Sequence, residues 1–560
     1  MNEPPKAWRI LAALVCLAIA SSLPISRSNA MPDAPSLAAS AVVDAPAGKL
    51  RGTIEDGLRV YKGIPFARPP VGPLRWRAPE KLPRWDGVRD AKAFGPACFQ
   101  PKPQLSGIYS PAAPLPMSED CLTLNIWAPK DAKAAAVFFW IHGGALTTGS
   151  SREPMYDGRK LAERGVVVVS INYRLGVLGW LAHPELSAEQ GGISGNYGLL
   201  DQIRALEWVR DNIRAFGGDP RNVTIAGESA GALSVMYLMA SPPARGLFSK
   251  AISESGYMIS TPALKKAVHG APSAEQAGVA LAATLKAPGI AALRQMDPAK
   301  LTEAAVAAGF GPWGAVDGRI LPDQLVNVFG QGKQAHVPLL VGFNQGEIRS
   351  LTVLAPPVPA SVKIYEERIR ALYRDLADPF LKLYPASDMQ QSIYAATRNG
   401  LYGWTAERLA RDQEAIGQPS YLYLWDHGYP AMDEAGLHAF HASELPFVFG
   451  TFHAVGLQWP KIPDTPAQTA MSDALGDYWT SFAKTGAPKA RHAPAWPRYD
   501  GSQAYMHFRR TPRPEAHPYP GMYQLFEEVM CRRRAAGNLP WNWNTGLAAP
   551  PLPEKPPGCA

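Results

Sequence analysis

The stretch from Asn222 to Ala240 constrains the fold of this chain most strongly. A short apolar run, Val223–Ala226, enters the tight turn 227–231 (Gly-Glu-Ser-Ala-Gly), and a segment without Gly or Pro follows, which predicts a helix. A strand, a G-x-S-x-G turn and a helix in this order are typical of a nucleophile elbow, which exposes a strained serine. We therefore expect Ser229 to be a nucleophile and the N–H of Ala230 to stabilise an oxyanion at the helix N-terminus.

G-x-S-x-G is a short pattern, and a Gly-rich turn with a merely tolerated serine is the alternative interpretation. A second feature supports the nucleophile. The segment 142–145 (His-Gly-Gly-Ala) directly follows the apolar run 135–141, which predicts a strand buried on both faces. The N–H groups of Gly143 and Gly144 could then point into a site, and together with Ala230 they would give three oxyanion donors. An ordinary Gly-rich strand exit remains the other possibility.

A serine nucleophile needs a base and an acid, and here the spacing leaves alternatives open. Late in the chain, His438 and His441 lie three residues apart, and spacing alone does not separate them. Glu347 follows a predicted strand, at the end of a parallel sheet where catalytic residues collect. Asp426, which follows the apolar run 421–425, is a rival for the acid.

The fold class follows from strands that alternate with helices. This order predicts an α/β fold with a large, mostly parallel central sheet, helices on both faces and helical cap insertions at 270–330 and 360–415. Residues 31–47 are small and Pro-rich and are expected to form a disordered lead. Four prolines between Tyr61 and Trp76 predict a surface wrap without a long helix or central strand. The predicted strands are 122–127, 135–141, 166–170, 223–226, 250–253, 337–342 and 421–425, and residues 197–216 are predicted to be helical.

The N-terminus has the pattern of a secretory signal peptide, which we assign to residues 1–30. Lys6 and Arg9 precede an apolar run, 10–20, that is too short to span a bilayer, and small residues end at Ala30. The mature chain, 31–560, is expected to be a single domain without an integral membrane segment. We predict export to the periplasm or the extracellular medium.

The cysteines agree with an oxidising compartment. Cys98, Cys121, Cys531 and Cys559 lie in the mature chain, and four cysteines allow three connectivities. Pairing Cys98 with Cys121 and Cys531 with Cys559 closes the shortest loops. No CxxC, HExxH or phosphate-binding glycine pattern occurs, so neither a metal nor another cofactor is expected. A net charge of +8 over 560 residues is too mild to indicate nucleic-acid binding, and no sequence feature sets the oligomeric state.

Several motifs together make the chain similar to the type-B carboxylesterase/lipase family, including para-nitrobenzyl-esterase-like bacterial members, of the α/β-hydrolase fold. The resemblance runs from about Gly48 to Pro497. It implies that Glu347 is the acid, that His441 is the base and that Cys98 pairs with Cys121. The motifs are 61–76, 118–127, 142–145, 172–176, 196–202, 216–220, 227–231, 254–256, 441–444 with 447–450, and 479–483.

The resemblance implies a serine hydrolase that cleaves carboxylic esters of small molecules through an acyl-enzyme. Glu228 and Ser255 are expected to support the catalytic residues from beside them. A lipase, a thioesterase or another acyl hydrolase would use the same residues, and a non-catalytic binding protein is a further alternative. The loop 99–120 contains no Trp, unlike the choline-binding loop of cholinesterases, which argues against choline esters.

Overall fold

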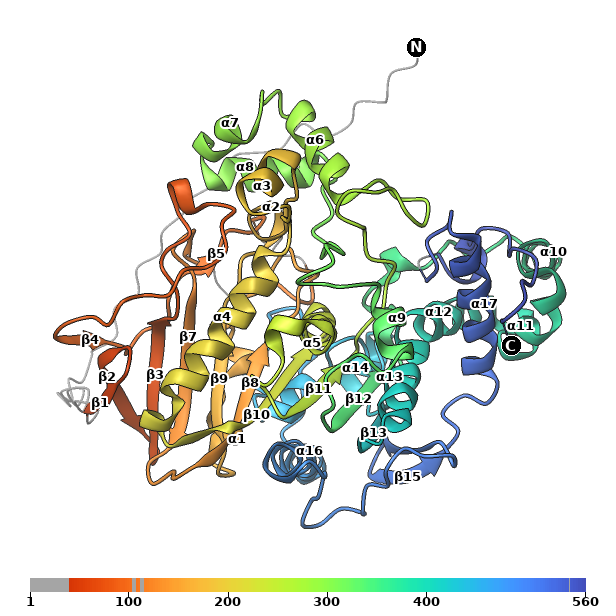
Figure 1. The fold of residues 1–560 in the computed structure, drawn as a ribbon. Coiled ribbons are helices and arrows are strands. Elements are labelled where there is room, and N and C mark those ends of the chain that lie inside the picture. Colours follow the sequence, from red (N-terminus) through yellow and green to blue (C-terminus); the bar gives the residue numbers. More distant parts are fainter. Residues whose placement is uncertain (1–39, 103–106, 111–114, 543, 560) are drawn as a thin grey trace, which may run out of the picture. The chain divides into compact units, whose positions relative to one another are not determined.

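The computed structural model describes residues 40–102, 107–110, 115–542 and 544–559, and within them thirteen strands form one sheet (Figure 1). From β9 to β14 the neighbouring strands of the sheet run parallel, in the order β9-β8-β10-β11-β12-β13-β14. The strands β1, β2, β3 and β7 at one end and β15 at the other pair antiparallel. This arrangement is the predicted α/β architecture.

The strand bounds are as follows: β1 Ser40–Ala45, β2 Gly48–Glu55, β3 Leu58–Pro65, β4 Val88–Asp90, β7 Thr123–Pro129, β8 Ala135–Ile141, β9 Val167–Ile171, β10 Gly218–Glu228, β11 Lys250–Glu254, β12 Leu339–Asn344, β13 Ser420–Trp425, β14 Ala504–Phe508 and β15 Pro512–Ala516. Two short strands, β5 (Ala97–Cys98) and β6 (Met117–Ser118), form a separate pair.

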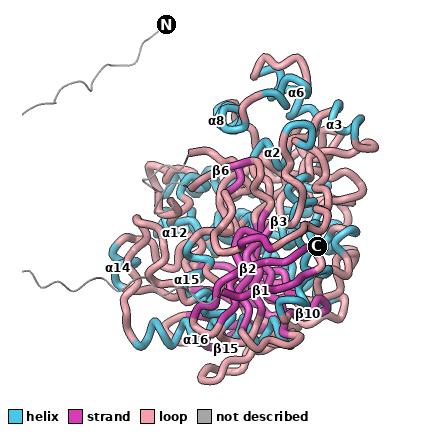
Figure 2. The backbone as a smooth tube through the Cα atoms, turned by 90° about the vertical axis from the view of Figure 1, so that its left-hand side faces the viewer, coloured by secondary structure: helices cyan, strands magenta, loops and turns pink. Residues whose placement is uncertain are grey.

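The central strand β8 is apolar throughout because both faces of the sheet are covered. Its alternate residues point to opposite faces. Phe139 and Ile141 join one core cluster with α4 (Tyr197–Asn212), α5 (Ala230–Ala240) and α13 (Trp404–Ala415). Phe138 and Trp140 join a second cluster with α1 (Arg159–Ala162), α15 (Leu445–Phe449) and α16 (Pro466–Thr485). The strands therefore lie between two layers of helices. In Figure 2 the strands are magenta and the helices cyan.

Most of the remaining helices lie in the two insertions that were predicted to be helical. The first insertion holds α6 (Ala274–Thr284), α7 (Ile290–Gln295), α8 (Pro298–Ala307) and α9 (Leu325–Gly330). The second holds α10 (Val362–Tyr373), α11 (Ala377–Leu383) and α12 (Met389–Arg398), and a π-helical turn, Asn399–Gly403, joins α12 to α13. Three short helices, α2 (Gly176–Trp180), α3 (Pro184–Glu189) and α14 (Pro430–Glu434), and the long α17 (Met522–Ala536) complete the set.

Two expectations for the N-terminal part are wrong. Part of the lead expected to be disordered, Ser40–Ala45, is strand β1, because Ala41, Val43 and Ala45 alternate into the core while the backbone pairs with β2. The wrap expected from Tyr61 begins inside β3, which lies in the sheet between β2 and β7. The strand accommodates Gly63 (φ +68°) because its pairing register shifts between Tyr61 and Ile64, as in a β-bulge.

The predicted signal peptide, 1–30, lies outside the described residues. Across the described ranges, the structure contains no helix of the length and apolar character needed to cross a membrane. Four cysteines of the described chain form two disulfides, Cys98–Cys121 and Cys531–Cys559.

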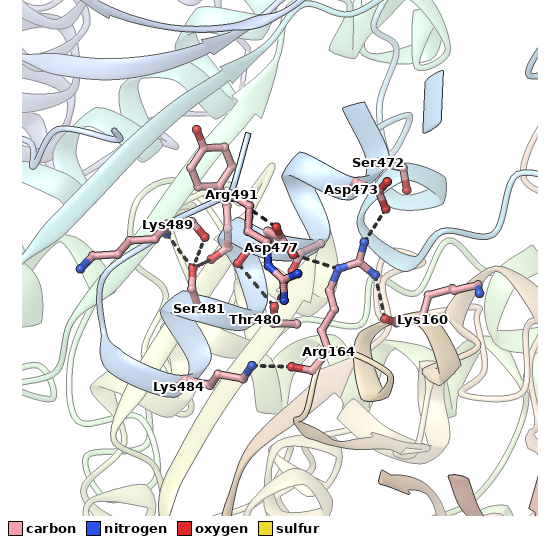
Figure 3. Close-up of polar contacts among 12 residues, drawn as sticks. Lys160, Arg164, Ser472, Asp473, Asp477, Thr480, Ser481, Lys484, Lys489 and Arg491 are labelled. Carbon is pink, nitrogen blue, oxygen red and sulfur yellow. Dashed lines mark hydrogen bonds and ion pairs between the residues drawn. The ribbon is translucent and has the colours of Figure 1, made fainter. Parts of the chain in front are cut away.

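Helix α16 is held against α1 by a polar network around Arg164 (Figure 3). The Arg164 guanidinium donates to Asp473 Oδ1 at 2.7 Å and to Asp477 Oδ1 at 3.3 Å. Lys484 at the end of α16 donates to the Arg164 carbonyl oxygen. The network fixes the helix that carries Trp479, whose Nε1 donates to the buried Glu254 Oε1 at 3.1 Å.

Candidate active site

Ser229 lies at the junction of β10, which ends at Glu228, and α5, which begins at Ala230. Its backbone has φ 57° and ψ −120°, a conformation that costs a non-Gly residue about 1–3 kcal/mol. Neighbouring elements enforce this conformation. The Ser229 N–H donates to the Glu254 carbonyl oxygen at 2.9 Å, and its own carbonyl oxygen accepts from Leu233 N–H at 2.9 Å. The serine is half-buried, as expected of a nucleophile elbow.

The glycines of the turn allow the helix and two strands to meet. A Cβ on Gly231 would lie 2.1 Å from the carbonyl oxygen of Ile141 in β8, and one on Gly227 would lie 2.5 Å from the Gly231 carbonyl carbon. Any side chain at either position would push α5 away from the strand ends. The same contacts bring the start of the 142–145 segment next to the elbow.

Gly143 lies directly beside Ser229. A Cβ on Gly143 would be 3.2 Å from the Ser229 Cβ. Gly144 has φ +103°, and its carbonyl oxygen accepts from Thr147 N–H and Thr148 N–H at 3.0 and 2.9 Å, which fixes the turn. The N–H groups of Gly143, Gly144 and Ala230 form no hydrogen bond with any other described residue. Three amide donors are thus free, and those of Gly143 and Ala230 belong to residues that adjoin the serine.

His441 and Glu347 form a buried pair. Nδ1 of His441 lies 2.5 Å from Oε2 of Glu347, and the second Glu347 oxygen accepts from Asn344 N–H at 2.8 Å. Both side chains are almost fully buried. The loop that bears Glu347 is fastened to the loop before His441, because Gly346 N–H donates to the Ala439 carbonyl oxygen at 2.9 Å.

Glu228 approaches the other nitrogen of the same imidazole. Its Oε1 lies 3.0 Å from Nε2 of His441, and no hydrogen bond joins Ser229 to His441 among the described residues. Burial acts to lower the pKa of His441, but the carboxylates of Glu228 and Glu347 outweigh it and raise this pKa from 6.5 to about 9. Burial also raises the pKa of Glu228. The imidazole is therefore held between two carboxylates.

The two rival residues contact each other instead. Asp426 lies 3.0 Å from His438 Nε2 and 3.0 Å from His507 Nε2, and His438 Nδ1 lies 2.7 Å from Asp433. Burial opposes ionisation of Asp426, yet the hydrogen bonds to His438 and His507 lower its pKa. These residues form a chain of alternating acids and imidazoles that links the ends of β13 and β14.

Sequence reasoning gave no role to Glu444, which joins the site through Asn344. Asn344 Nδ2 donates to Glu444 Oε2 at 2.5 Å and to the Phe440 carbonyl oxygen at 2.9 Å. Burial raises the pKa of Glu444 to about 7. Its place in the motif 441–444 was the available signal. Ser255, expected to support the site, is fully buried at φ 50°, and its hydroxyl bonds to no described residue.

Two tyrosines against His441 also escaped prediction. Tyr109, inside the Cys98–Cys121 loop, donates from its hydroxyl to the His441 carbonyl oxygen at 2.9 Å and lies 2.6 Å from Ser350 Oγ. The ring of Tyr402, in the π-helical turn, lies 5.4 Å from the imidazole. No sequence signal pointed to either contact. Among the described residues, no cluster of three or more His, Cys, Asp or Glu side chains could hold a metal ion.

Comparison with known proteins assigns the family. Residues 39–526 match the model of the carboxylesterase family. The chain is 37% identical to para-nitrobenzyl esterase of Bacillus subtilis over 460 residues, which cover 81% of this chain and 91% of the relative. It is 35% identical to fumonisin B1 esterase of Sphingopyxis macrogoltabida, over 81% of this chain and 84% of the relative.

Solved structures agree. A PNB esterase structure matches with a TM-score of 0.75 at 35% identity, covering 86% of this chain and 99% of that one. A carboxylesterase of Geobacillus stearothermophilus matches with a TM-score of 0.71 at 34% identity, covering 88% and 99%. The chain therefore belongs to the carboxylesterase family of the α/β-hydrolase fold and is a carboxylic ester hydrolase.

Proposed function

We propose that Ser229, His441 and Glu347 form the catalytic triad of this hydrolase and that the reaction passes through an acyl-enzyme. Ser229 Oγ attacks the ester carbonyl carbon while Nε2 of His441 accepts the hydroxyl proton. Glu347 holds the proton on Nδ1 and stabilises the imidazolium. His441 then protonates the leaving alcohol, and a water molecule repeats the sequence on the acyl group. The two products are a carboxylic acid and an alcohol.

The observation that carries this proposal is the position of Glu228. It precedes Ser229 in the chain, and its carboxylate lies 3.0 Å from the nitrogen of His441 that would accept the serine proton. The base nitrogen and the elbow are therefore neighbours, although Nε2 faces Glu228 in the structure. Catalytic hydrogen bonds are often long or poorly aligned before substrate binds, and they tighten in the complex. In the proposed mechanism, Nε2 exchanges its contact with Glu228 for a hydrogen bond with Ser229 Oγ.

The oxyanion would be stabilised by the N–H groups of Gly143, Gly144 and Ala230. The closeness of Gly143 to Ser229 and the free amide groups support this role. Removing one such donor typically costs about 10²–10³-fold in rate. The N-terminus of α5 adds its dipole at the same point.

For substrate, we propose esters of aryl or benzyl alcohols, since para-nitrobenzyl esterase is a relative at 37% identity. Thioester hydrolysis is a second candidate, because a duck relative at 33% identity is named a medium-chain fatty acyl-CoA hydrolase. Both reactions would use the same triad and oxyanion donors.

We also propose that the protein is exported and that residues 1–30 are its signal peptide. Two disulfides in the described chain support an oxidising compartment. N-terminal sequencing of the secreted protein would test the cleavage site, and a mature chain that still begins at Met1 would contradict it.

The triad is tested with p-nitrophenyl esters from acetate to palmitate and with p-nitrobenzyl acetate. We expect Ser229→Ala to lose at least about 10³-fold in kcat/KM while its melting temperature stays close to wild type. A fluorophosphonate probe should label wild type and leave Ser229→Ala unlabelled. The matched control is Ser249→Ala, a half-buried serine whose hydroxyl donates to the Val223 carbonyl oxygen at 3.2 Å in the same sheet. Full activity in Ser229→Ala would refute the assignment.

A further inference from the structure

A cavity lies beside the loop that carries Glu347. Its volume is about 160 Å³, whereas a single water needs only about 10–15 Å³ measured in this way. The loop contributes the wall through Gln345, Gly346, Ile348 and Arg349. Helix α12 contributes Gln391, Tyr394, Ala395 and Arg398, and Tyr519 closes the set. The cavity is thus large enough for a small organic molecule.

Two arginines line this cavity without a carboxylate partner. Arg349 donates to Gln391 Oε1 at 3.0 Å and to the Gly436 carbonyl oxygen at 3.2 Å. Arg398 is 5% exposed and donates to Asn399 Oδ1 at 2.8 Å and to the Gln345 carbonyl oxygen at 2.9 Å. Within the described chain, both guanidinium groups therefore hydrogen-bond only to neutral oxygens. A buried arginine normally has an anionic partner.

Tyr519 holds one of these arginines in place at the cost of backbone strain. The guanidinium carbon of Arg398 lies 4.3 Å from the centre of the Tyr519 ring, a cation–π contact. Tyr519 adopts φ 107°, a conformation that a bulky residue keeps only where its surroundings enforce it. Strained residues of this kind cluster at active sites and ligand sites, and this one lies against an arginine that has no carboxylate partner among the described residues.

Glu347, on the loop that lines the cavity, and Asp426 are both paired with other groups. The carboxylate of Glu347 is turned to His441 and to Asn344 N–H. Asp426, which lies near enough to influence the pKa of Tyr519, is already paired with His438, His507 and Arg509. Neither group neutralises Arg349 or Arg398, so the cavity presents excess positive charge.

We propose that this cavity is a binding site for a small carboxylate anion. Arginine offers paired N–H donors that match the two oxygens of a carboxylate, and stacking on an aromatic ring preserves that geometry. The protein hydrolyses carboxylic esters, so each turnover releases a carboxylate that could occupy the site. Carboxylates from solution are the other source of the same chemistry.

A carboxylate bound in the cavity would also contact the loops that carry the proposed catalytic residues. Arg349 lies two residues from Glu347, and its hydrogen bond to Gly436 ties it to the segment that leads to His441. The site therefore contacts the segments that hold the proposed acid and base. The binding claim stands independently of the triad, because it is measured without turnover.

Calorimetric titration of the whole mature protein with succinate tests the proposal, with succinamide as an uncharged probe of similar size and inorganic phosphate as a second anion. We expect saturable binding of succinate at one site per chain and no binding of succinamide. Arg349→Gln should weaken succinate binding at least tenfold. Arg221→Gln is the matched control, because it removes the charge of an arginine whose side chain is 82% exposed. This variant should bind succinate as the wild type does.

A second variant keeps the test decisive. Gln391 is exposed and already contacts Arg349, so Gln391→Glu supplies an internal carboxylate without changing the shape of the site. It should abolish succinate binding and leave the melting temperature unchanged or raised. Succinate binding that is equal in wild type, Arg349→Gln and Gln391→Glu would overturn the proposal. Tighter binding of phosphate than of succinate would overturn its assignment to carboxylates. If the site is filled by the product of ester hydrolysis, the carboxylate released from an ester that the enzyme cleaves should bind more tightly than succinate.

Discussion

The carboxylate of Glu228 lies 3.0 Å from Nε2 of His441, the nitrogen that must accept a proton from Ser229 in the proposed mechanism. Glu347 holds Nδ1 of the same ring at 2.5 Å. The imidazole thus has a carboxylate at each nitrogen before any substrate arrives, which favours its protonated form.

The first prediction concerns pH. A base must be neutral to accept a proton, and the surrounding carboxylates raise the pKa of His441 to about 9. We expect kcat/KM to rise with pH through that pKa. Replacing Glu228 with Gln removes one anion that stabilises the imidazolium of His441. The rise of kcat/KM with pH should therefore move to lower pH by roughly one unit. The measurement is the pH profile of kcat/KM for both proteins.

Glu515→Gln is the control for that profile. Glu515 also contacts an imidazole, since its Oε2 lies 2.9 Å from His507 Nδ1, but His507 belongs to the Asp426 network. The pH profile of kcat/KM of the Glu515→Gln variant should therefore match that of the wild type. A shift of equal size in both variants would mean that the pH dependence does not report on His441.

The second prediction separates the two histidines. His441→Ala should lower kcat/KM by at least about 10³-fold, because it removes the proton acceptor. His438→Ala should retain activity within about tenfold but lose about 1–2 kcal/mol of unfolding free energy, because it breaks contacts with Asp426 and Asp433. Kinetics and urea denaturation of both variants make the comparison. The opposite pattern of activity would reassign the base to His438.

The third prediction concerns Asn344, which donates hydrogen bonds to two of the site's carboxylates, Glu347 and Glu444. Its N–H donates to Glu347 and its side chain to Glu444 and the Phe440 carbonyl oxygen. Asn344→Ala leaves buried acceptors unpaired and should cost about 1–3 kcal/mol of unfolding free energy. Asn327→Ala, which removes contacts only to Asp323 nearer the surface, should cost less. Equal losses of unfolding free energy in the two variants would show that the buried hydrogen bonds of Asn344 contribute no more than the more exposed ones of Asn327.

The fourth prediction distinguishes the two disulfides. Removing either pair by Cys→Ser should cost roughly 3–4 kcal/mol, since their sequence separations, 23 and 28, are similar. Only the Cys98–Cys121 variant should also lose activity, because its loop carries Tyr109, which donates to His441. Melting temperature and kcat/KM of both double variants test this. An active-site defect in the Cys531–Cys559 variant instead would contradict it.

The sequence predicted the parts of the fold that depend on local pattern. The apolar run 135–141 matches the bounds of β8, and the glycine turn after Val223–Ala226 marked the elbow. The edge strands β1 and β15, and β14 next to β15, were not predicted, because pairing with a neighbouring strand, and not a local apolar pattern, makes these segments strands. Contacts such as that between Tyr109 and His441 join segments that are far apart in the chain. Because they depend on side-chain rotamers, no local sequence pattern predicts them.

The two ends of the sheet differ in their tendency to self-associate. The edge strand β15, Pro512–Ala516, contains Pro512 and Pro514, which have no N–H to offer a further strand. At the other end β1 has no proline, and its Val42 side chain is 57% exposed. Within the described ranges, no strand pairs with the outer edge of β1, and an unpaired edge can template intermolecular strand addition. Aggregation on concentration or partial unfolding should therefore begin at β1, where a Lys in place of Val42 would act as a gatekeeper.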